Sequence, residues 1–237
     1  MQNTRIESLM ARLAKQMNVD PYGDLTRVHT GSRLVKALSP RYIVNKLSQW
    51  LYERRHPDHP WLTRDAIALL AAHIGPGQRG FEWGSGNGSR WFAKRSASLV
   101  SVEHNSAWYT TVRQGHTDAG ITNVDYRFVE EPHYTAVIDE FADESFDYVL
   151  VDGLFRDQAF LKSIPKLKPG GWIIFDNANW YLPSDSKTPH SRSRLDGPAS
   201  ALFGKVAEQT AAWTTYWTSN GVNDTAIFIK PENESVG

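Results

Sequence analysis

The sequence of 237 residues contains no cysteine. This absence excludes disulfide bonds, a catalytic thiolate and a zinc site with cysteine ligands. No apolar run reaches the ~18 residues that cross a membrane as a helix, and the first residues lack the pattern of a signal peptide. We therefore expect a protein of the cytoplasm with no part inserted in a membrane.

An excess of charge of either sign is also missing. The 26 basic and 26 acidic residues give a formal net charge of zero. This balance argues against a surface that binds nucleic-acid phosphates over a wide area, so we do not expect nucleic acid as a partner. Hydrophobic residues make up 41% of the chain, which is enough for the core of one large α/β domain with a small appendage.

Residues 1–75 are predicted to be helical, because their apolar residues recur at intervals of three and four. The first helix would carry Ile6, Leu9, Met10, Leu13 and Met17 on one side. A second helix is expected over residues 40–55, and Thr63 is a suitable N-cap for a third. The second helix would carry Ile43, Leu47, Trp50 and Leu51 on one side. These helices either pack against a sheet or cover a substrate; we assign residues 1–75 to a helical cap and residues 76–237 to the main domain.

A glycine-rich stretch at residues 81–89, Phe-Glu-Trp-Gly-Ser-Gly-Asn-Gly-Ser, lies between a predicted strand and a predicted helix. Glycine allows positive φ in such a turn and leaves no Cβ between the backbone and a ligand. The dinucleotide pattern G-x-G-x-x-G is excluded, because Gly88 follows Gly86 by only two residues. The stretch therefore predicts either a cradle for another small molecule or a tight turn without a ligand.

Strands and helices alternate after the glycine-rich stretch, which predicts a parallel sheet with right-handed crossovers. After the first strand, strands are expected at 99–102, 124–129, 145–151 and 172–175, and helices at 90–95, 107–114 and 157–167. The run Lys168-Pro169-Gly170-Gly171 is expected to end the last of these helices as a turn. Asn220-Gly221 predicts a closing antiparallel hairpin between strands at 211–218 and 222–230.

Residues 178–198 are polar and long for a connection inside a compact domain, so we interpret them as a mobile lid. They include a basic cluster of His190, Arg192 and Arg194. This cluster would steer an anionic substrate, contact RNA, or lie in solvent as an ordinary loop surface.

Acidic residues are expected at the carboxyl ends of three strands. Glu103 ends the second strand, where a carboxylate can accept hydrogen bonds from both hydroxyls of a ribose; the alternative is a helix-capping role. Asp152 follows the fourth strand and is expected at the switch point of the sheet, where ligands bind in open α/β folds. Asp176 and Asn177 follow the fifth strand.

The pattern Glu82-x-Gly84-x-Gly86-x-Gly88 resembles motif I of the class I S-adenosylmethionine-dependent methyltransferases. The Leu-Lys-Pro-Gly-Gly run before the fifth strand and the terminal hairpin are similar to later parts of that family, so the resemblance covers about residues 75–230. It implies an α/β, Rossmann-like fold with a mostly parallel seven-stranded sheet, a C-terminal antiparallel hairpin and an N-terminal helical cap. It also implies S-adenosyl-L-methionine as the cofactor, bound by Glu82, Gly84, Ser85, Gly86, Gly88, Glu103, His104, Glu131 and Asp152.

Methyl transfer to a hydroxyl also requires removal of its proton, by a side chain or by a metal. Asp152, Asp176 and Asn177 resemble the metal ligands of catechol and caffeoyl-coenzyme A O-methyltransferases, which implies Mg²⁺. Those enzymes place a lysine after the first aspartate, where this chain has Arg156. Arginine cannot act as a base, but it can hold a substrate anion or pair with Asp152. Without a metal, Asp152 or His133 would be the base.

We interpret the chain as an S-adenosylmethionine-dependent methyltransferase that acts on an oxygen of a small molecule, such as a sugar or a secondary metabolite. The catalytic candidates are Asp152, His133, Arg156 and Asp176. Methylation of RNA or protein, and cofactor binding without catalysis, stay open as further possibilities. A homodimer stays open as the assembly.

Overall fold

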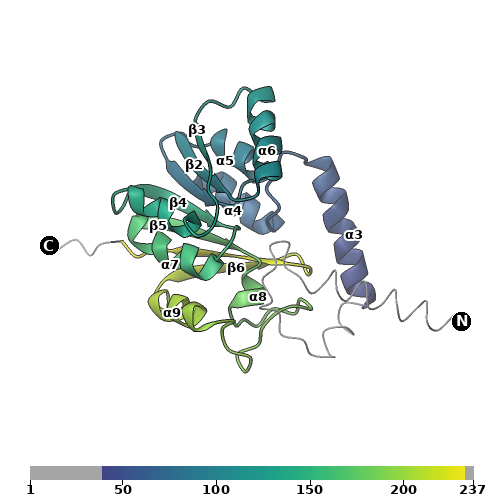
Figure 1. Ribbon diagram of the computed structural model, residues 1–237. Coiled ribbons are helices and arrows are strands. Elements are labelled where there is room, and N and C mark those ends of the chain that lie inside the picture. The colour runs from purple at the N-terminus through teal and green to yellow at the C-terminus, as the bar shows by residue number, and fades with distance from the viewer. Residues whose placement is uncertain (1–38, 233–237) are drawn as a thin grey trace, which may run out of the picture.

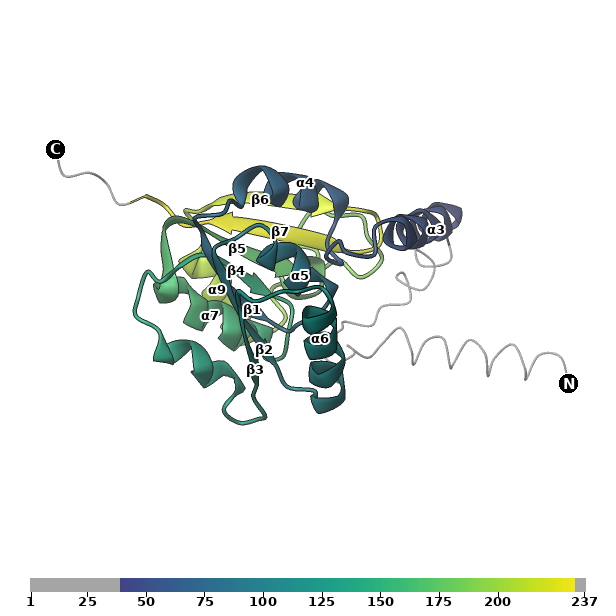
Figure 2. The same ribbon diagram turned by 90° about the horizontal axis from the view of Figure 1, so that it is seen from above.

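The computed structural model describes residues 39–232 as a sheet covered by helices on both faces (Figures 1 and 2). The strands are β1 Arg79–Trp83, β2 Ser98–Glu103, β3 Val124–Phe128, β4 Phe146–Val151, β5 Leu167–Asp176, β6 Thr214–Ser219 and β7 Asp224–Ile229. The helices are α3 Pro40–Arg55, α4 Arg64–His73, α5 Asn87–Ala93, α6 Ser106–Asp118, the 3₁₀ helix η1 Tyr134–Glu140, α7 Arg156–Lys166, α8 Ala178–Tyr181 and α9 Ala201–Gln209.

The seven strands lie in the order β3-β2-β1-β4-β5-β7-β6. Strands β1 to β5 pair in parallel, while β7 pairs antiparallel with both β5 and β6. The predicted sheet with its antiparallel C-terminal hairpin is therefore confirmed. The hairpin turns at residues 220–223, where Gly221 has a φ of +77°.

Strand β4 shows how the alternation of side chains builds the two halves of the core. Tyr148 and Leu150 point to the face covered by α4 and α5, and Val149 and Val151 point to the face covered by η1, α7 and α9. Because both faces are covered, nearly every residue of this strand is apolar and buried. The carboxyl end of the strand then delivers Asp152 to the edge of the sheet.

Three features of the chain after β3 differ from the prediction. The run at residues 168–171 is part of β5 and not a turn, because Gly170 N donates to Lys230 O at 3.0 Å and the strand continues through an irregular register. Helices η1 and α9 were not predicted. Both are short, and packing of Ile138 and Phe203 into the core holds them in place.

The two described N-terminal helices differ in what they contact. Helix α3 has the predicted bounds, with Ser39 as N-cap, but it lies at the edge of the molecule and leaves Ile43, Leu47 and Trp50 exposed (Figure 2). Helix α4 begins after Thr63 as predicted and shares a core with the sheet. The stripe predicted at residues 6–17 lies outside the described residues, and the domain boundary at residue 75 stays a prediction.

The predicted lid at residues 178–198 is packed against the domain over much of its length. Tyr181 and Leu182 belong to the core, and Pro183 forms an isolated bridge with Arg192. The sequence analysis missed these buried residues because the segment as a whole is polar. Among residues 39–232, no helix has both the length and the apolar character that a membrane crossing requires.

Candidate active site

The turns after β1 and β4 touch each other through two glycines. Gly84 has a φ of +85°, and a Cβ on it would lie 2.8 Å from the Cα of Gly153. A Cβ on Gly153 would lie 2.0 Å from the hydroxyl oxygen of Tyr134 and 2.8 Å from Gly84 N. Gly84, which we predicted from a cofactor motif, therefore has a structural role in closing the two turns against each other.

Gly86 is open where Gly84 is crowded. Its φ of 178° is an ordinary extended value, and no atom lies within 4 Å of an added Cβ. Gly86 lines a hollow of about 80 Å³ together with Ser85, Gly88 and Asp152. This is less than the ~300–1,000 Å³ of a complete small-molecule site, so the hollow by itself is too small for a whole cofactor.

Glu82 on β1 is hydrogen-bonded to β2 and to α5, the strand and the helix beside the glycine-rich turn. Its Oε2 accepts hydrogen bonds from Ser89 Oγ on α5 and Ser101 Oγ on β2, both at 2.5 Å, and its carboxyl group also lines the hollow. Burial raises the pKa of Glu82 to about 8. The side chain therefore joins two strands and a helix, in addition to the cofactor contact that we predicted for it.

Glu103 is fully buried at the end of β2, as predicted, and both its oxygens have partners in the protein. Its Oε2 accepts from Ser85 N at 3.1 Å and Ser85 Oγ at 2.9 Å, and its Oε1 accepts from the backbone N–H groups of His104 and Asn105. A ribose diol would have to replace the Ser85 hydroxyl to reach this carboxylate. The ribose contact stays a prediction.

His104, Glu131 and His133, which we also predicted as site residues, do not form one cluster. The His104 ring lies against the ring of Tyr134, with 5.8 Å between centroids, and its Nδ1 lies 3.1 Å from Glu103 Oε1. Glu131 and His133 follow β3 and are exposed. Among the contacts of the described residues, His133 has none with Asp152, Arg156 or Asp176. The structure therefore does not bring this candidate base to the acidic cluster, by which we mean Asp152 and Asp176 at the ends of β4 and β5.

Four predicted residues converge where β4 and β5 end. Arg156 is buried and donates to Asp152 Oδ1 at 2.7 Å, to the backbone oxygen of Asp176 at 2.7 Å and to Asn177 Oδ1 at 3.4 Å. The Asp176 side chain is also buried, and its Oδ1 accepts from Thr225 Oγ1 at 3.1 Å. Burial and the neighbouring Asp152 raise the pKa of Asp176 to about 8.

This arrangement does not fit the divalent metal that we predicted. Oxygen atoms of Asp152 and Asn177 are of the type that Mg²⁺ prefers, but both accept hydrogen bonds from the Arg156 guanidinium. A second cation would repel the guanidinium and compete for the same oxygens. Elsewhere in the described part of the chain, no group of three or more His, Asp or Glu side chains is placed to hold a metal ion.

Sequence reasoning missed several residues around the glycine-rich turn. Trp108 Nε1 donates to Ser85 O at 2.8 Å, and the Tyr126 hydroxyl lies 2.7 Å from Ser85 Oγ. Pro60 and Trp61, from the connection between α3 and α4, line the hollow from the other side. No periodicity or motif marks these residues, because each reaches the turn only through the tertiary fold.

The basic cluster predicted in the lid is not a single patch. Arg192 is buried and donates to the backbone oxygens of Gly197 and Asp196, at 2.7 and 3.1 Å. Arg194 is exposed and pairs with Asp185 at 3.3 Å. Arg192 therefore serves to fold the segment, and the charge of Arg194 is balanced by a neighbour.

The strand order, the antiparallel β7 and the glycine-rich turn after β1 define the class I methyltransferase fold. Residues 81–178 match the model of a methyltransferase domain family, and the chain is an S-adenosylmethionine-dependent methyltransferase. No curated protein sequence matches the chain.

Solved structures with the same fold include the O-methyltransferase TomG from Streptomyces achromogenes, which is involved in tomaymycin synthesis. It has a TM-score of 0.53 and 17% identity, over 98% of this chain and 99% of TomG. A putative caffeoyl-CoA O-methyltransferase from Staphylococcus aureus has a TM-score of 0.52 and 17% identity, over 83% of this chain and 99% of that one. The putative methyltransferase SMU.1697c from Streptococcus mutans, in complex with SAH, has a TM-score of 0.51 and 12% identity, over 69% and 94% of the two chains. At these identities the similarity establishes the fold alone.

Proposed function

We propose that this methyltransferase acts on a hydroxyl oxygen of a small molecule. The observation that carries the proposal is the Asp152 side chain, which is 33% exposed, lines the hollow at the glycine-rich turn and is held by Arg156. A carboxylate in this position can accept a proton from an acceptor beside the cofactor. The names of TomG and of the caffeoyl-CoA enzyme, both O-methyltransferases, support an oxygen acceptor.

In the proposed mechanism the protein aligns two partners and removes one proton. S-adenosylmethionine supplies a methyl group that is already activated by its sulfonium, so that alignment and exclusion of water are the main tasks. Asp152 accepts the hydroxyl proton as the oxygen forms its bond to the methyl carbon and the carbon–sulfur bond breaks. Arg156 is a positioning residue, because it fixes the Asp152 carboxylate through a 2.7 Å ion pair.

Calorimetric titration of the full chain with S-adenosylhomocysteine tests the cofactor assignment. We expect micromolar affinity for this ligand and no heat with NADH, since the glycine spacing is not that of a dinucleotide fold. A folded sample that gives no heat with S-adenosylhomocysteine would contradict the proposed function.

Turnover of an acceptor tests the mechanism, with catechols, phenols and sugars as the panel. We expect Asp152→Asn to lower kcat by about 100-fold or more, because the variant cannot accept the proton.

EDTA should leave the wild-type rate unchanged, since Arg156 and not a metal holds the Asp152 carboxylate. Loss of turnover in EDTA with recovery on adding Mg²⁺ would show that the reaction depends on a metal. Turnover on RNA or protein in place of the panel would identify a macromolecular acceptor, and no turnover with any acceptor would favour cofactor binding without catalysis.

We also propose a homodimer in which the apolar side of α3 is covered by the partner. Leu47 is 55% exposed and Trp50 is 49% exposed on this helix, which is unusual for large apolar side chains on neighbouring turns. Leu47→Lys should shift the mass measured by light scattering from dimer to monomer. Leu195→Lys is the matched control, because Leu195 is 99% exposed outside α3 and should leave the mass unchanged. A monomeric wild-type chain would contradict the proposal.

A further inference from the structure

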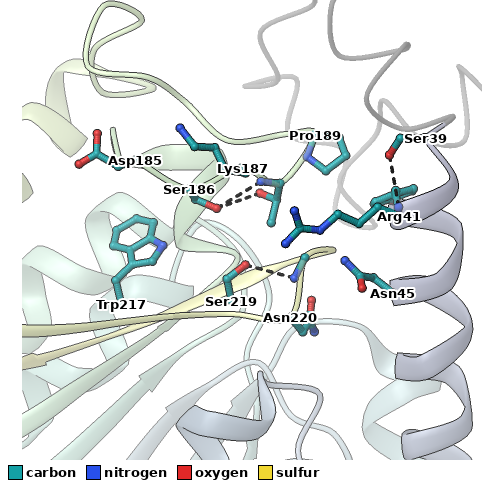
Figure 3. Close-up of a pocket in the computed structure, with 13 residues that line it drawn as sticks. Ser39, Arg41, Asn45, Asp185, Ser186, Lys187, Pro189, Trp217, Ser219 and Asn220 are labelled. Carbon is teal, nitrogen blue, oxygen red and sulfur yellow. Dashed lines mark hydrogen bonds between the residues drawn. The ribbon is translucent and has the colours of Figure 1, made fainter.

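A second and larger hollow lies between α3, residues 185–189 and the turn from β6 to β7 (Figure 3). Its volume of about 670 Å³ is within the ~300–1,000 Å³ typical of sites for small molecules. Trp217 forms one wall, and hydroxyl and amide groups line much of the rest. The sequence analysis reached this part of the molecule only through the predicted lid at residues 178–198 and the turn at Asn220-Gly221.

This hollow lies at the same edge of the sheet as the acidic cluster. Asp176 pairs with Thr225 on β7, which pairs with Thr218 on β6, and Ser219 follows in the lining. Because neighbouring strands are ~4.8 Å apart, Ser219 lies roughly 10 Å from Asp176 along the sheet. The hollow and the acidic cluster therefore lie at the same end of the sheet, two strands apart.

Buried hydrogen bonds also connect the hollow to the acidic cluster. Asn179 lies directly after the cluster and donates from Nδ2 to Thr188 Oγ1 in the lining at 2.9 Å. The same side chain accepts from Asp224 N at 3.2 Å, and Asp224 in turn accepts from Trp217 Nε1 at 2.8 Å. The indole ring is thus held in a fixed position as a wall of the hollow.

Among residues 39–232, the positive charges that line the hollow are not balanced by acidic partners. Arg41 extends its guanidinium into it from the first turn of α3, as Figure 3 shows, and Lys187 belongs to the opposite side. The one acidic residue of the described lining, Asp185, pairs with Arg194. Within residues 39–232, neither Arg41 nor Lys187 has an ion pair or a side-chain hydrogen bond.

We propose that this hollow binds the methyl acceptor through an anionic group, a phosphate or a carboxylate, held by Arg41 and Lys187. The proposal rests on the proposed function, since it places the reacting hydroxyl of the same molecule at Asp152. Arginine suits this role because its planar guanidinium binds either anion through two parallel hydrogen bonds. The indole of Trp217 offers a flat apolar surface for a ring of the acceptor.

Binding of phenyl phosphate to the full chain, measured by calorimetry at low salt, tests the proposal. Benzyl alcohol is the neutral probe of similar size. We expect phenyl phosphate to bind more tightly than benzyl alcohol, and Arg41→Gln to weaken its binding by about 10-fold through loss of a charge-assisted hydrogen bond. Arg55→Gln is the matched control, because it removes the same charge from the other end of α3 and should change nothing.

Two results would overturn the proposal: equal binding of the charged and the neutral probe, or equal loss of phosphate binding in Arg41→Gln and Arg55→Gln. Titration with S-adenosylhomocysteine on the same samples separates this failure from that of the proposed function. Normal cofactor binding without phosphate binding would reject the anion site alone. Arg41-dependent phosphate binding without cofactor binding would support the anion site and reject the methyltransferase activity.

Discussion

Gly153→Ala is expected to lower the free energy of unfolding by about 3 kcal/mol, because the new methyl group has no room. Its Cβ would lie 2.0 Å from the Tyr134 hydroxyl oxygen and within 2.9 Å of backbone atoms of Gly84 and Trp83. Tyr134 is fully buried and cannot swing away, and the two turns can separate only by breaking the edge of the sheet. Denaturant unfolding followed by circular dichroism measures the change.

Gly86→Ala is the matched control for this prediction, because it adds the same methyl group to the neighbouring turn. Its backbone is extended and nothing lies within 4 Å of the added atom, so stability should fall only by the small cost of alanine at the N-cap of α5 and much less than in Gly153→Ala. The methyl group would instead enter the hollow and weaken S-adenosylhomocysteine binding. Equal stability of Gly153→Ala and wild type would contradict the packing described for the two turns. Equal cofactor affinity of Gly86→Ala and wild type would contradict the cradle.

The second large effect is a dependence of stability on pH that comes from Glu82. Its pKa is raised from an ordinary 4.5 to about 8 by burial, so the folded chain binds a proton that the unfolded chain releases. The stability that this proton contributes is complete below about pH 4.5 and is lost as the pH rises toward about 8. One such proton corresponds to about 1.4 kcal/mol per pH unit within this window.

Glu82→Gln should remove this contribution, because glutamine resembles the protonated acid and keeps an oxygen that can accept from Ser89 and Ser101. We expect the unfolding free energy of the wild type to fall more steeply with rising pH than that of the variant. Asp176, whose pKa is also raised by burial, is present in both proteins, so the difference in slope isolates Glu82. Glu131→Gln is the control, since Glu131 is exposed. Equal slopes for wild type and Glu82→Gln would show that Glu82 is ionised in the folded chain.

Much of the sheet could be predicted from the sequence, because local patterns determine it. The short runs that became β1, β2 and β4 are buried on both faces, and each ends in a glycine or an acid at the carboxyl end of the sheet. The same edge placed Glu103 at the end of β2 and Asp152 after β4, as predicted. The alternation with helices predicted that the strands are parallel, and Asn220-Gly221 predicted the closing hairpin, but the order of the strands appears only in the structure.

The roles of the site residues could not be predicted, because they depend on partners that are distant in the sequence. Gly84 and Gly86 are equivalent in the motif, yet only the approach of Gly153, 69 residues after Gly84, crowds one and leaves the other open. Arg156 became the partner of Asp152 and Asn177 only when β4 and β5 brought their ends together. Arg41 and Lys187 are unremarkable in the sequence, and folding places them around one hollow.

The sequence by itself determined the class of fold and the place of the glycine-rich turn, since hydrophobic periodicity and glycine spacing act over a few residues. The tertiary structure alone decided which acids are buried, which cations are compensated and where an acceptor has room. These properties depend on the residues that several strands and helices place around each side chain. Charge and burial at a site are therefore decided by packing, even where the residues that supply them are evident in the chain.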